Sequence, residues 1–429
     1  MGAIFVGLGL RFMPRAFVPA HLAGHAVYQE DKLITENQRL QLLDLIRDTK
    51  TYASNVDQAK ATGFVPTYEH LGEAQPIQPD GSCSHSYLFP NHDKTLCVLP
   101  ERVDVGRHFI QTGGLDGVKE NFYDLVSRVS SFSRFTFAKD FYKYPLVQEL
   151  FDSETFQTAA KSVCPQNSSH LDPFQFSFIL SVPGQTVAVH LDAPYFWGAS
   201  RYRFPQWLLV AMVFSGLFQD RFINQIQVVG YLHDWTLQDG AGASEGGDFV
   251  YYKDANTVGV MRPAPGSGTI VDGSKVLHAA KIYRAHSKAP RLPKDRASSL
   301  IYVGGDRWEL QTDGEMVHQY STSDLRISIV YRARCFSSPA EAQRYSALPQ
   351  EDMLSLEYVM GAFKRDLTSR GKGSPLQLEG MPPLDFLFLI IDTYITYPLP
   401  PWEFATIPYN YCALSRLMPW TAPLLRLLC

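Results

Sequence analysis

Two side chains that commonly bind metals stand two positions apart near the middle of the chain. His190 and Asp192 close the stretch 183–192, whose alternating small and β-branched residues favour a strand. Successive side chains of a strand point to opposite faces, so an imidazole and a carboxylate two residues apart can reach one ion. We therefore predict that His190 and Asp192 form one corner of a metal site.

A third ligand has to come from another part of the chain. His278 lies in 276–283, a second short run that favours a strand. Two histidines and one carboxylate on one side of an ion leave the opposite side open, which is the arrangement of non-haem Fe(II) oxygenases. We predict that His190, Asp192 and His278 are the catalytic ligands of Fe(II).

Rival residues exist for both parts of this site. His170 and Asp172 repeat the spacing of the first pair, but Pro173 follows them and favours a loop. His286 is the alternative to His278 and lies in a basic stretch bounded by proline. Both alternatives stay open at the level of sequence.

The late strand-like run 325–336 offers a site for a carboxylate. Arg326 and Ser328 share one face of this run, and a guanidinium fork with a neighbouring hydroxyl can bind one carboxylate. We predict that they hold the distal end of a dicarboxylic acid. Arg284 and Arg332 are the alternatives to Arg326.

These pieces follow an order that resembles the 2-oxoglutarate and Fe(II)-dependent oxygenases, particularly their prolyl-4-hydroxylase-like branch. The resemblance covers about residues 174–336. It rests on Pro183-Gly184-Gln185, His190-x-Asp192, Tyr231-Leu232, the Gly246-Gly247 turn in 245–249, the run 265–269 before His278, and Arg326-x-Ser328. It implies a double-stranded β-helix (jelly-roll), iron bound by the two histidines and the aspartate, and 2-oxoglutarate bound by Arg326 and Ser328.

The resemblance also implies an enzyme, a dioxygenase that hydroxylates or further oxidises a C–H bond of an unknown small-molecule or peptidyl substrate. Succinate and CO₂ would be released. The expected cofactors and cosubstrates are Fe(II), 2-oxoglutarate and O₂, with ascorbate as a further candidate. Two other functions stay open, namely a non-catalytic β-helix protein that binds a ligand or partner, and a zinc hydrolase that uses the same three ligands.

The sequence departs from this family pattern at several points. Leu180-Ser181-Val182 stands where many relatives carry a tyrosine before the turn. Extra segments also separate the site residues: 194–224 follows Asp192, and 288–324 lies between His278 and Arg326. Variable loops at a barrel mouth commonly contact the substrate, so we predict that substrate choice depends on these two insertions.

The elements that must position these residues are mostly short strands. They are expected at 174–182, 186–193, 226–234, 248–252, 268–272, 276–283, 299–303, 308–311 and 325–336. Helices are expected at 35–49, 118–129, 146–163, 205–218, from 339 onward and at 353–367. The predicted class is α+β: an N-terminal, mainly helical region (1–165), a β-helix oxygenase domain (166–336) and a helical, proline-broken apolar extension (337–429).

Composition limits the partners and the location. The chain of 429 residues is 45% hydrophobic and 13% aromatic, which excludes a disordered protein, and its net charge of −4 gives no reason to expect nucleic acid as a partner. The longest apolar runs, 207–218 and 386–391, are shorter than the ~20 residues of a transmembrane helix, so none is expected.

Cysteine usage and the N-terminus suggest a compartment. Six cysteines are scattered without a C-x-x-C pair, and we predict that they are free thiols in a reducing compartment. The expected location is the cytoplasm, with organellar targeting open because no acidic residue precedes Glu30. The oligomeric state is left open.

Overall fold

The computed structural model describes residues 18–54, 71, 74–81, 83–85, 87–90, 95–104, 129–235, 246–254, 257–292, 296–398 and 419–425. The predicted helix at 118–129, Cys412, Cys429 and the N-terminal segment before residue 18 lie outside these residues. No helix in the described ranges has the length and apolarity to cross a bilayer.

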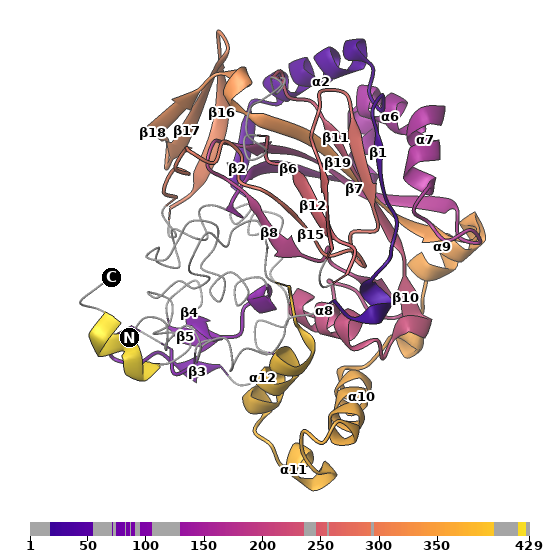
Figure 1. Ribbon diagram of the computed structural model, residues 1–429, viewed down its shortest axis with the longest axis vertical. Helices are drawn as coiled ribbons and strands as arrows, with labels where there is room; N and C mark the ends of the chain where they lie inside the picture. The colour runs from indigo at the N-terminus through magenta and orange to yellow at the C-terminus, as the bar shows by residue number, and fades with distance from the viewer. Residues whose placement is uncertain are drawn as a thin grey trace.

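A large antiparallel sheet organises the molecule (Figure 1). Its strand order is β1-β14-β11-β19-β7-β6-β2-β16-β17-β18. The bounds are β1 Val27–Glu30, β2 Thr51–Ser54, β6 Phe132–Phe137, β7 His170–Ser181, β11 Gln225–Tyr231, β14 Gly268–Val271, β16 Ser298–Gly304, β17 Arg307–Thr312, β18 Glu315–Tyr320 and β19 Arg326–Phe336. The longest strands, β7 and β19, pair along their whole length at the centre.

A smaller four-stranded sheet faces the centre of the large one. Its order is β13-β12-β15-β8, with β8 Val187–His190, β12 Phe249–Tyr252, β13 Val258–Met261 and β15 His278–Ala280. The chain passes from β7 to β8, back to β11, over to β12 and β13, back to β14, over to β15 and finally to β19. Mixed helix and sheet content is thus confirmed, with the two sheets built from alternating segments of the chain.

Helices cover the outer face of the large sheet. α2 (Glu36–Thr49), α6 (Pro145–Asp152) and α7 (Glu154–Lys161) lie together on this side (Figure 1). α2 begins at the predicted capping box, in which Thr35 accepts a hydrogen bond from the Gln38 amide and the Gln38 side chain accepts one from the Thr35 amide. The predicted helix at 146–163 is instead two helices, because Ser153 is extended and caps α7 through the Phe156 amide.

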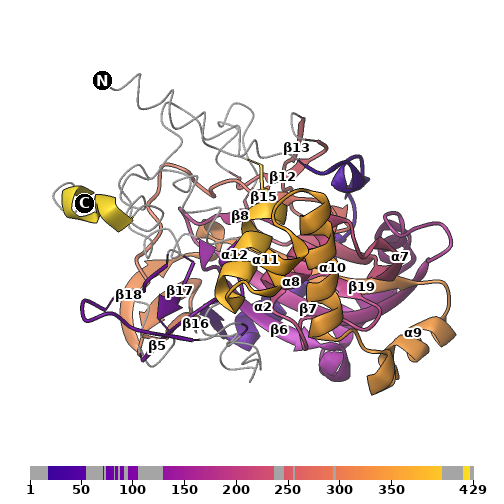
Figure 2. The same ribbon diagram turned by 90° about the horizontal axis from the view of Figure 1, so that it is seen from below.

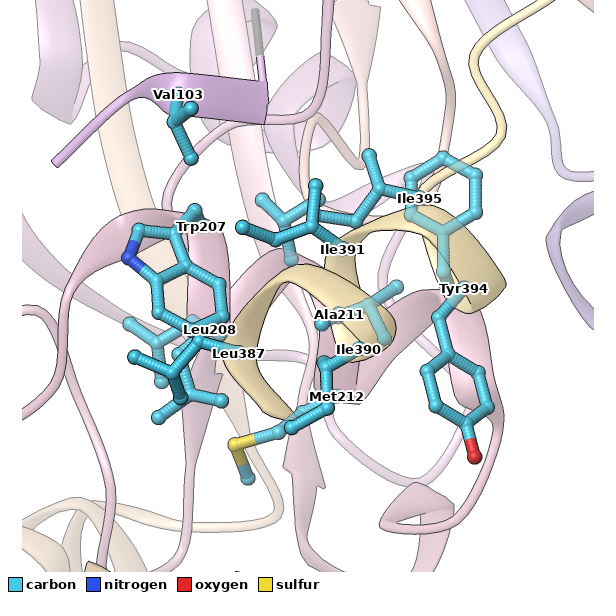
Figure 3. Close-up of a cluster of buried hydrophobic side chains, with 14 of the residues drawn as sticks. Val103, Trp207, Leu208, Ala211, Met212, Leu387, Ile390, Ile391, Tyr394 and Ile395 are labelled. Atoms are coloured by element: carbon cyan, nitrogen blue, oxygen red, sulfur yellow. The ribbon is translucent and has the colours of Figure 1, made fainter. Parts of the chain in front are cut away.

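A second group of helices packs at the far side of the small sheet (Figure 2). α8 (Gln206–Ser215) is buried on all sides, as the predicted apolar helix at 205–218 requires. α12 (Pro383–Tyr394) lies against it, with Leu387, Ile390 and Ile391 facing Ala211 and Met212 (Figure 3). α10 (Leu356–Ser369) and α11 (Pro375–Glu379) complete this group, so the apolar C-terminal extension is part of the hydrophobic core.

The N-terminal region contributes more strand than its sequence suggests. β1 pairs with β14, while β2 and β6 extend the large sheet beyond β7. These short strands lack a run of alternating residues, and their pairing depends on neighbours distant in the chain. Within the insertion 288–324, the strands predicted at 299–303 and 308–311 are confirmed as β16 and β17, whereas β18 and the pairing of β16 with β2 were not predicted. The division into three regions stays a prediction.

The prediction of free thiols is wrong for four cysteines. Cys83 is bonded to Cys97, and Cys164 is bonded to Cys335. The second pair joins the end of α7 to β19 across 171 residues of sequence, a proximity that only the tertiary fold creates. The argument from free thiols to a reducing compartment therefore no longer holds.

Candidate metal centre

The strand pairing brings the three predicted metal ligands together. His190 ends β8, His278 begins β15, and the two residues stand directly opposite each other in the antiparallel register. Asp192 follows β8 and turns into the same space. One ligand atom from each residue lies within 4.8 Å of the others.

The spacing of these atoms is close to that of a metal site. Nε2 of His190 is 3.7 Å from Oδ1 of Asp192, and the two imidazole rings are 4.3 Å apart at their centroids. Neighbouring ligands at bond lengths of ~2.1 Å would be ~3 Å apart. Side-chain adjustment of less than about 1 Å would bring the His190 and Asp192 atoms to that distance.

Both histidines are oriented in the same way. Nδ1 of His190 lies 2.8 Å from the carbonyl oxygen of Ala188, and Nδ1 of His278 lies 2.8 Å from that of Val276. A carbonyl oxygen only accepts hydrogen bonds, so each Nδ1 carries a proton, and in the neutral form of either ring Nε2 is the nitrogen with the lone pair. This fixes the tautomer that binds a metal through Nε2.

The electrostatics of the site also favour metal binding. Burial, followed by the proximity of His190, lowers the pKa of His278 to about 4, so this ring is neutral at neutral pH. Burial would raise the pKa of Asp192, but Arg332 and the two histidines together bring it well below its usual value. The Asp192 carboxylate is therefore ionised, and its Oδ2 is buried without a hydrogen-bond partner among the described residues.

A glycine makes room for the carboxylate. The amide of Asp192 donates to the carbonyl oxygen of Gly273 at 2.8 Å. A Cβ atom on Gly273 would lie 2.2 Å from Oδ2 of Asp192, so a side chain there would force the carboxylate to move. The close approach of the backbone to the predicted metal ligand therefore favours glycine at position 273.

The C-terminal extension contacts the backbone of the tripeptide His190-Leu191-Asp192. The hydroxyl of Tyr397 accepts a hydrogen bond from the Leu191 amide at 3.3 Å and donates to Oδ2 of Asp104 at 2.9 Å. Asp104 is fully buried and also accepts from Arg102. Leu191 is the residue between the two ligands, so a segment more than 200 residues away positions them. Nothing in the sequence pattern points to this role.

Arg326 begins β19 and lies on the face of the large sheet that points toward the small sheet. It is buried, and its guanidinium lies 5.3 Å from the ring centre of Tyr231, whose hydroxyl is 3.0 Å from Oγ1 of Thr269. Ser328, two residues on, is also buried and is 3.4 Å from the Ile179 carbonyl oxygen. Tyr231 thus places a phenol beside Arg326 from strand β11. Many relatives instead carry a tyrosine at the position of 180–182, where this sequence has none.

The rival residues lie elsewhere or have other partners. His170 and Asp172 belong to β7 rather than to a loop, and Asp172 forms an ion pair with Arg334 at 2.6 Å. Arg284 is paired with Asp324 at 2.8 Å. His286 is in an exposed loop. Arg332 lies beside the metal ligands, 3.6 Å from Oδ1 of Asp192.

The face that surrounds these residues is polar and incompletely hydrogen-bonded. Side chains on the four central strands that point toward the small sheet are Gln175, Ser177, Ile179, Ser181, Gln225, Gln227, Val229, Tyr231, Thr269, Val271, Arg326, Ser328, Val330 and Arg332. Within the described ranges, four buried atoms on this inner face lack a hydrogen-bond partner: Ser177 Oγ, Gln225 Oε1, Gln227 Oε1 and Arg326 Nε. Buried polar groups are normally satisfied, so this pattern is typical of a site for a polar ligand.

Comparison with known proteins gives similar structures but no sequence match. No family model matches the chain, and no curated protein does. The solved structures to which it is similar include 2-oxoglutarate-Fe(II) oxygenases and prolyl-4-hydroxylases.

Three of these structures illustrate the extent of the likeness. An oxidoreductase of the 2OG-Fe(II) oxygenase family from Burkholderia pseudomallei is 12% identical with a TM-score of 0.24, and the match covers 45% of this chain and 57% of that one. A Pseudomonas putida prolyl-4-hydroxylase is 11% identical with a TM-score of 0.28, over 72% and 92%. A Trichoplax adhaerens prolyl hydroxylase, solved with a hypoxia inducible factor peptide, is 12% identical with a TM-score of 0.26, over 58% and 82%.

Proposed function

We propose that this protein is an Fe(II)- and 2-oxoglutarate-dependent dioxygenase that hydroxylates, or further oxidises, a C–H bond of its substrate and releases succinate and CO₂. One observation carries the proposal: two imidazoles and a buried carboxylate converge on a polar inner face that also holds the buried cation Arg326. A 2-His-1-carboxylate set with an open side is the donor set of non-haem Fe(II) oxygenases.

The strand order supports a double-stranded β-helix as the core. Successive strands from β7 to β19 alternate between two facing four-strand layers, β14-β11-β19-β7 and β13-β12-β15-β8. This places β8 and β15 side by side in one layer and β19 opposite them in the other. Such an arrangement brings ligands from β8 and β15 close to a cation on β19.

Each residue has a distinct role in this proposal. His190, Asp192 and His278 bind the metal, the histidines through Nε2. Arg326 binds the distal carboxylate of 2-oxoglutarate, with the Ser328 and Tyr231 hydroxyls as further hydrogen-bond partners. Bound Fe(II) would couple the oxidative decarboxylation of 2-oxoglutarate to oxidation of the substrate. The polar atoms of the inner face that lack partners would form hydrogen bonds to the cosubstrate.

In this proposal, the two insertions determine which substrate the protein binds. The segment 194–224 follows Asp192 directly and carries β9 (Tyr195–Phe196), α8 and β10 (Phe222–Ile223). The segment 288–324 extends the large sheet at its other end, and its Arg296 is paired with Asp313 and Glu315. The first insertion therefore lies closer to the metal ligands along the chain and is the stronger determinant of substrate choice.

Succinate formation tests the proposal. The protein is loaded with Fe(II) under anaerobic conditions and supplied with 2-oxoglutarate and O₂, and we expect slow succinate formation even without a substrate. His278→Ala should abolish it, whereas His318→Ala, on the exposed face of β18, should not. A protein that binds iron yet neither binds nor decarboxylates 2-oxoglutarate would contradict the proposal, as would hydrolase activity supported by zinc alone.

A further inference from the structure

A small cavity opens beside Asp192, at the end of the inner face opposite Arg326. Its volume is about 160 Å³, enough for a small polar group of a larger molecule. Its polar wall contains two guanidinium groups, those of Arg201 and Arg332, together with the amides of Gln175 and Gln225. The remaining wall contains three aromatic rings, those of Phe135, Phe174 and Tyr195, together with Ala193, Gln206 and the Asp192 carboxylate that is the predicted metal ligand.

Arg332 differs sharply from its neighbour on the strand. Arg334 has a short ion pair with Asp172 at 2.6 Å and lies over three aromatic rings, which accounts for its place in the fold. Among the described residues, the only carboxylate in ion-pair distance of Arg332 is that of Asp192, at 3.6 Å. In the proposed site, that carboxylate would coordinate the metal ion. Arg332, like Arg326 at the start of β19, therefore has no carboxylate partner other than a predicted metal ligand among the described residues.

An unsatisfied amide points to a ligand at the same place. Gln225 is 1% exposed; its Nε2 donates to the Ala193 carbonyl oxygen at 3.3 Å, while its Oε1 has no hydrogen-bond partner in the described part of the chain. A buried amide oxygen without a hydrogen-bond partner is unfavourable, because it has lost its contacts with water and gained none in the protein. Rotation of this amide would direct Nε2 to a ligand, so the group can serve as a donor beside the two guanidiniums.

This cavity is separate from the carboxylate site at Arg326. Arg326 and Arg332 are six residues apart on β19 and point to the same face, which at ~3.3 Å per residue separates their backbones by roughly 20 Å. The metal ligands lie near the Arg332 end, since Gln227, which pairs with Arg332 in the register, is 3.3 Å from Nε2 of His278. A cosubstrate that reaches from the metal to Arg326 would leave this cavity open.

We infer that the cavity binds an oxyanionic group, a carboxylate or a phosphate, of an apolar small-molecule substrate. Two guanidinium groups and adaptable amides recognise an oxyanion, and the aromatic wall accepts the apolar body that carries it. Binding there would hold the substrate beside the metal ligands. This inference rests on the proposed function for its meaning, but the binding site can be tested without turnover.

Calorimetry with three probe molecules tests the inference. Benzoate, phenyl phosphate and benzamide are titrated into the metal-free protein, and then into the protein loaded anaerobically with Fe(II) and 2-oxoglutarate. We expect benzoate or phenyl phosphate to bind at least tenfold more tightly than the uncharged benzamide. The tighter of the two anions identifies a carboxylate or a phosphate as the natural group.

Variants locate the binding. Arg201→Gln and Gln225→Glu should each weaken anion binding at least tenfold, the second because it places a negative charge in the cavity. Arg203→Gln, in the same loop but hydrogen-bonded to Gln350 at the surface, is the matched control and should change little. Arg326→Gln should also leave probe binding unchanged.

Three results would overturn the inference. They are equal binding of benzamide and the anions, anion binding unaffected by both cavity variants, and loss of binding in Arg326→Gln, which would assign the probe to the other carboxylate site. Iron and 2-oxoglutarate binding are measured on the same samples. Their loss with probe binding intact would refute the proposed function and leave the oxyanion site standing.

Discussion

The two faces of the large sheet differ in a way that separates folding from function. On the outer face, the side chains of β7 and β19 that alternate with the polar ones are Phe176, Phe178, Leu180, Ile327, Ile329 and Tyr331, all part of one hydrophobic cluster under α2, α6 and α7. On the inner face the same strands carry serine, glutamine and arginine. A sandwich that served only for stability would be apolar between its sheets.

Adjacent residues show the contrast most directly. Phe176 contacts the rings of Phe141, Tyr144 and Phe151, whereas the Ser177 hydroxyl is buried without a partner among the described residues. The outer face is therefore complete as it stands. The inner face becomes complete only with a polar ligand, and this difference is the physical basis of the proposed function.

The largest expected effect is a loss of metal affinity when a side chain fills the space beside Asp192. Gly273→Ala should reduce metal affinity by about 10- to 100-fold, because its Cβ would displace Asp192 Oδ2. The outer hydrophobic cluster is untouched, so the metal-free variant should unfold at nearly the wild-type denaturant concentration. Calorimetric titration of Fe(II) or Mn(II) measures the first quantity. Wild-type metal affinity in this variant would show that Asp192 is not a ligand.

Exchange of one side chain on each face should affect stability unequally. Phe176→Ala should lower the free energy of unfolding by about 3–5 kcal/mol, because it leaves a cavity among aromatic rings. Ser177→Ala should change it by less than about 0.5 kcal/mol, because the hydroxyl that it removes has no partner. Urea unfolding of the metal-free proteins measures both. Equal losses would mean that the inner face contributes to the core in the same way as the outer face.

The inner face should also make folding sensitive to acid. Burial, followed by the charges of Arg326 and Arg39, lowers the pKa of His233 to about 3. The unfolded chain takes up this proton below pH ~6.5 and the folded protein does not, so stability falls as pH falls from about 6.5 toward 3. Between pH 7 and pH 5 the wild type should lose about 2 kcal/mol more than His233→Phe, which keeps a ring stacked on Trp235. Parallel pH profiles for the two proteins would refute this.

The smallest effect is expected from the C-terminal support of the tripeptide. Tyr397→Phe removes the acceptor of the Leu191 amide and should weaken metal binding by up to about tenfold, in keeping with the ~1 kcal/mol of one hydrogen bond. Tyr394→Phe is the matched control, since its hydroxyl donates to Asp366 on the surface side of the same extension. If both variants bound metal like the wild type, the extension would serve the core alone.

The features of the fold and the candidate site that depend on neighbouring residues could be predicted from the sequence. The strand alternation that predicts a shared face for His190 and Asp192, and the capping box at Thr35, depend on residues a few positions apart. The sequence also indicated His278 and Arg326, and the structure brings His278 to the other two predicted ligands. Their roles as iron and cosubstrate ligands stay predictions.

Other features depend on contacts between distant segments, and no local pattern indicates them. Tyr231, Gly273 and Tyr397 become relevant only through what they touch. The bond between Cys164 and Cys335 and the pairing of β2 with β16 are likewise products of the tertiary fold. The helix predicted at 146–163 shows the opposite case, because the signal for its interruption, the cap at Ser153, was present in the sequence.

Binding of 2-oxoglutarate to the anaerobic Fe(II) protein tests the central claim most directly. We predict that it binds the wild type only when metal is present, and that Arg326→Ala weakens it by about 30-fold or more, equivalent to ~2 kcal/mol, with little change in iron affinity. Arg326→Lys should restore part of the loss, and Arg307→Ala, exposed on β17, should have no effect. Equal affinity for 2-oxoglutarate in the wild type, Arg326→Ala and His278→Ala would contradict the account.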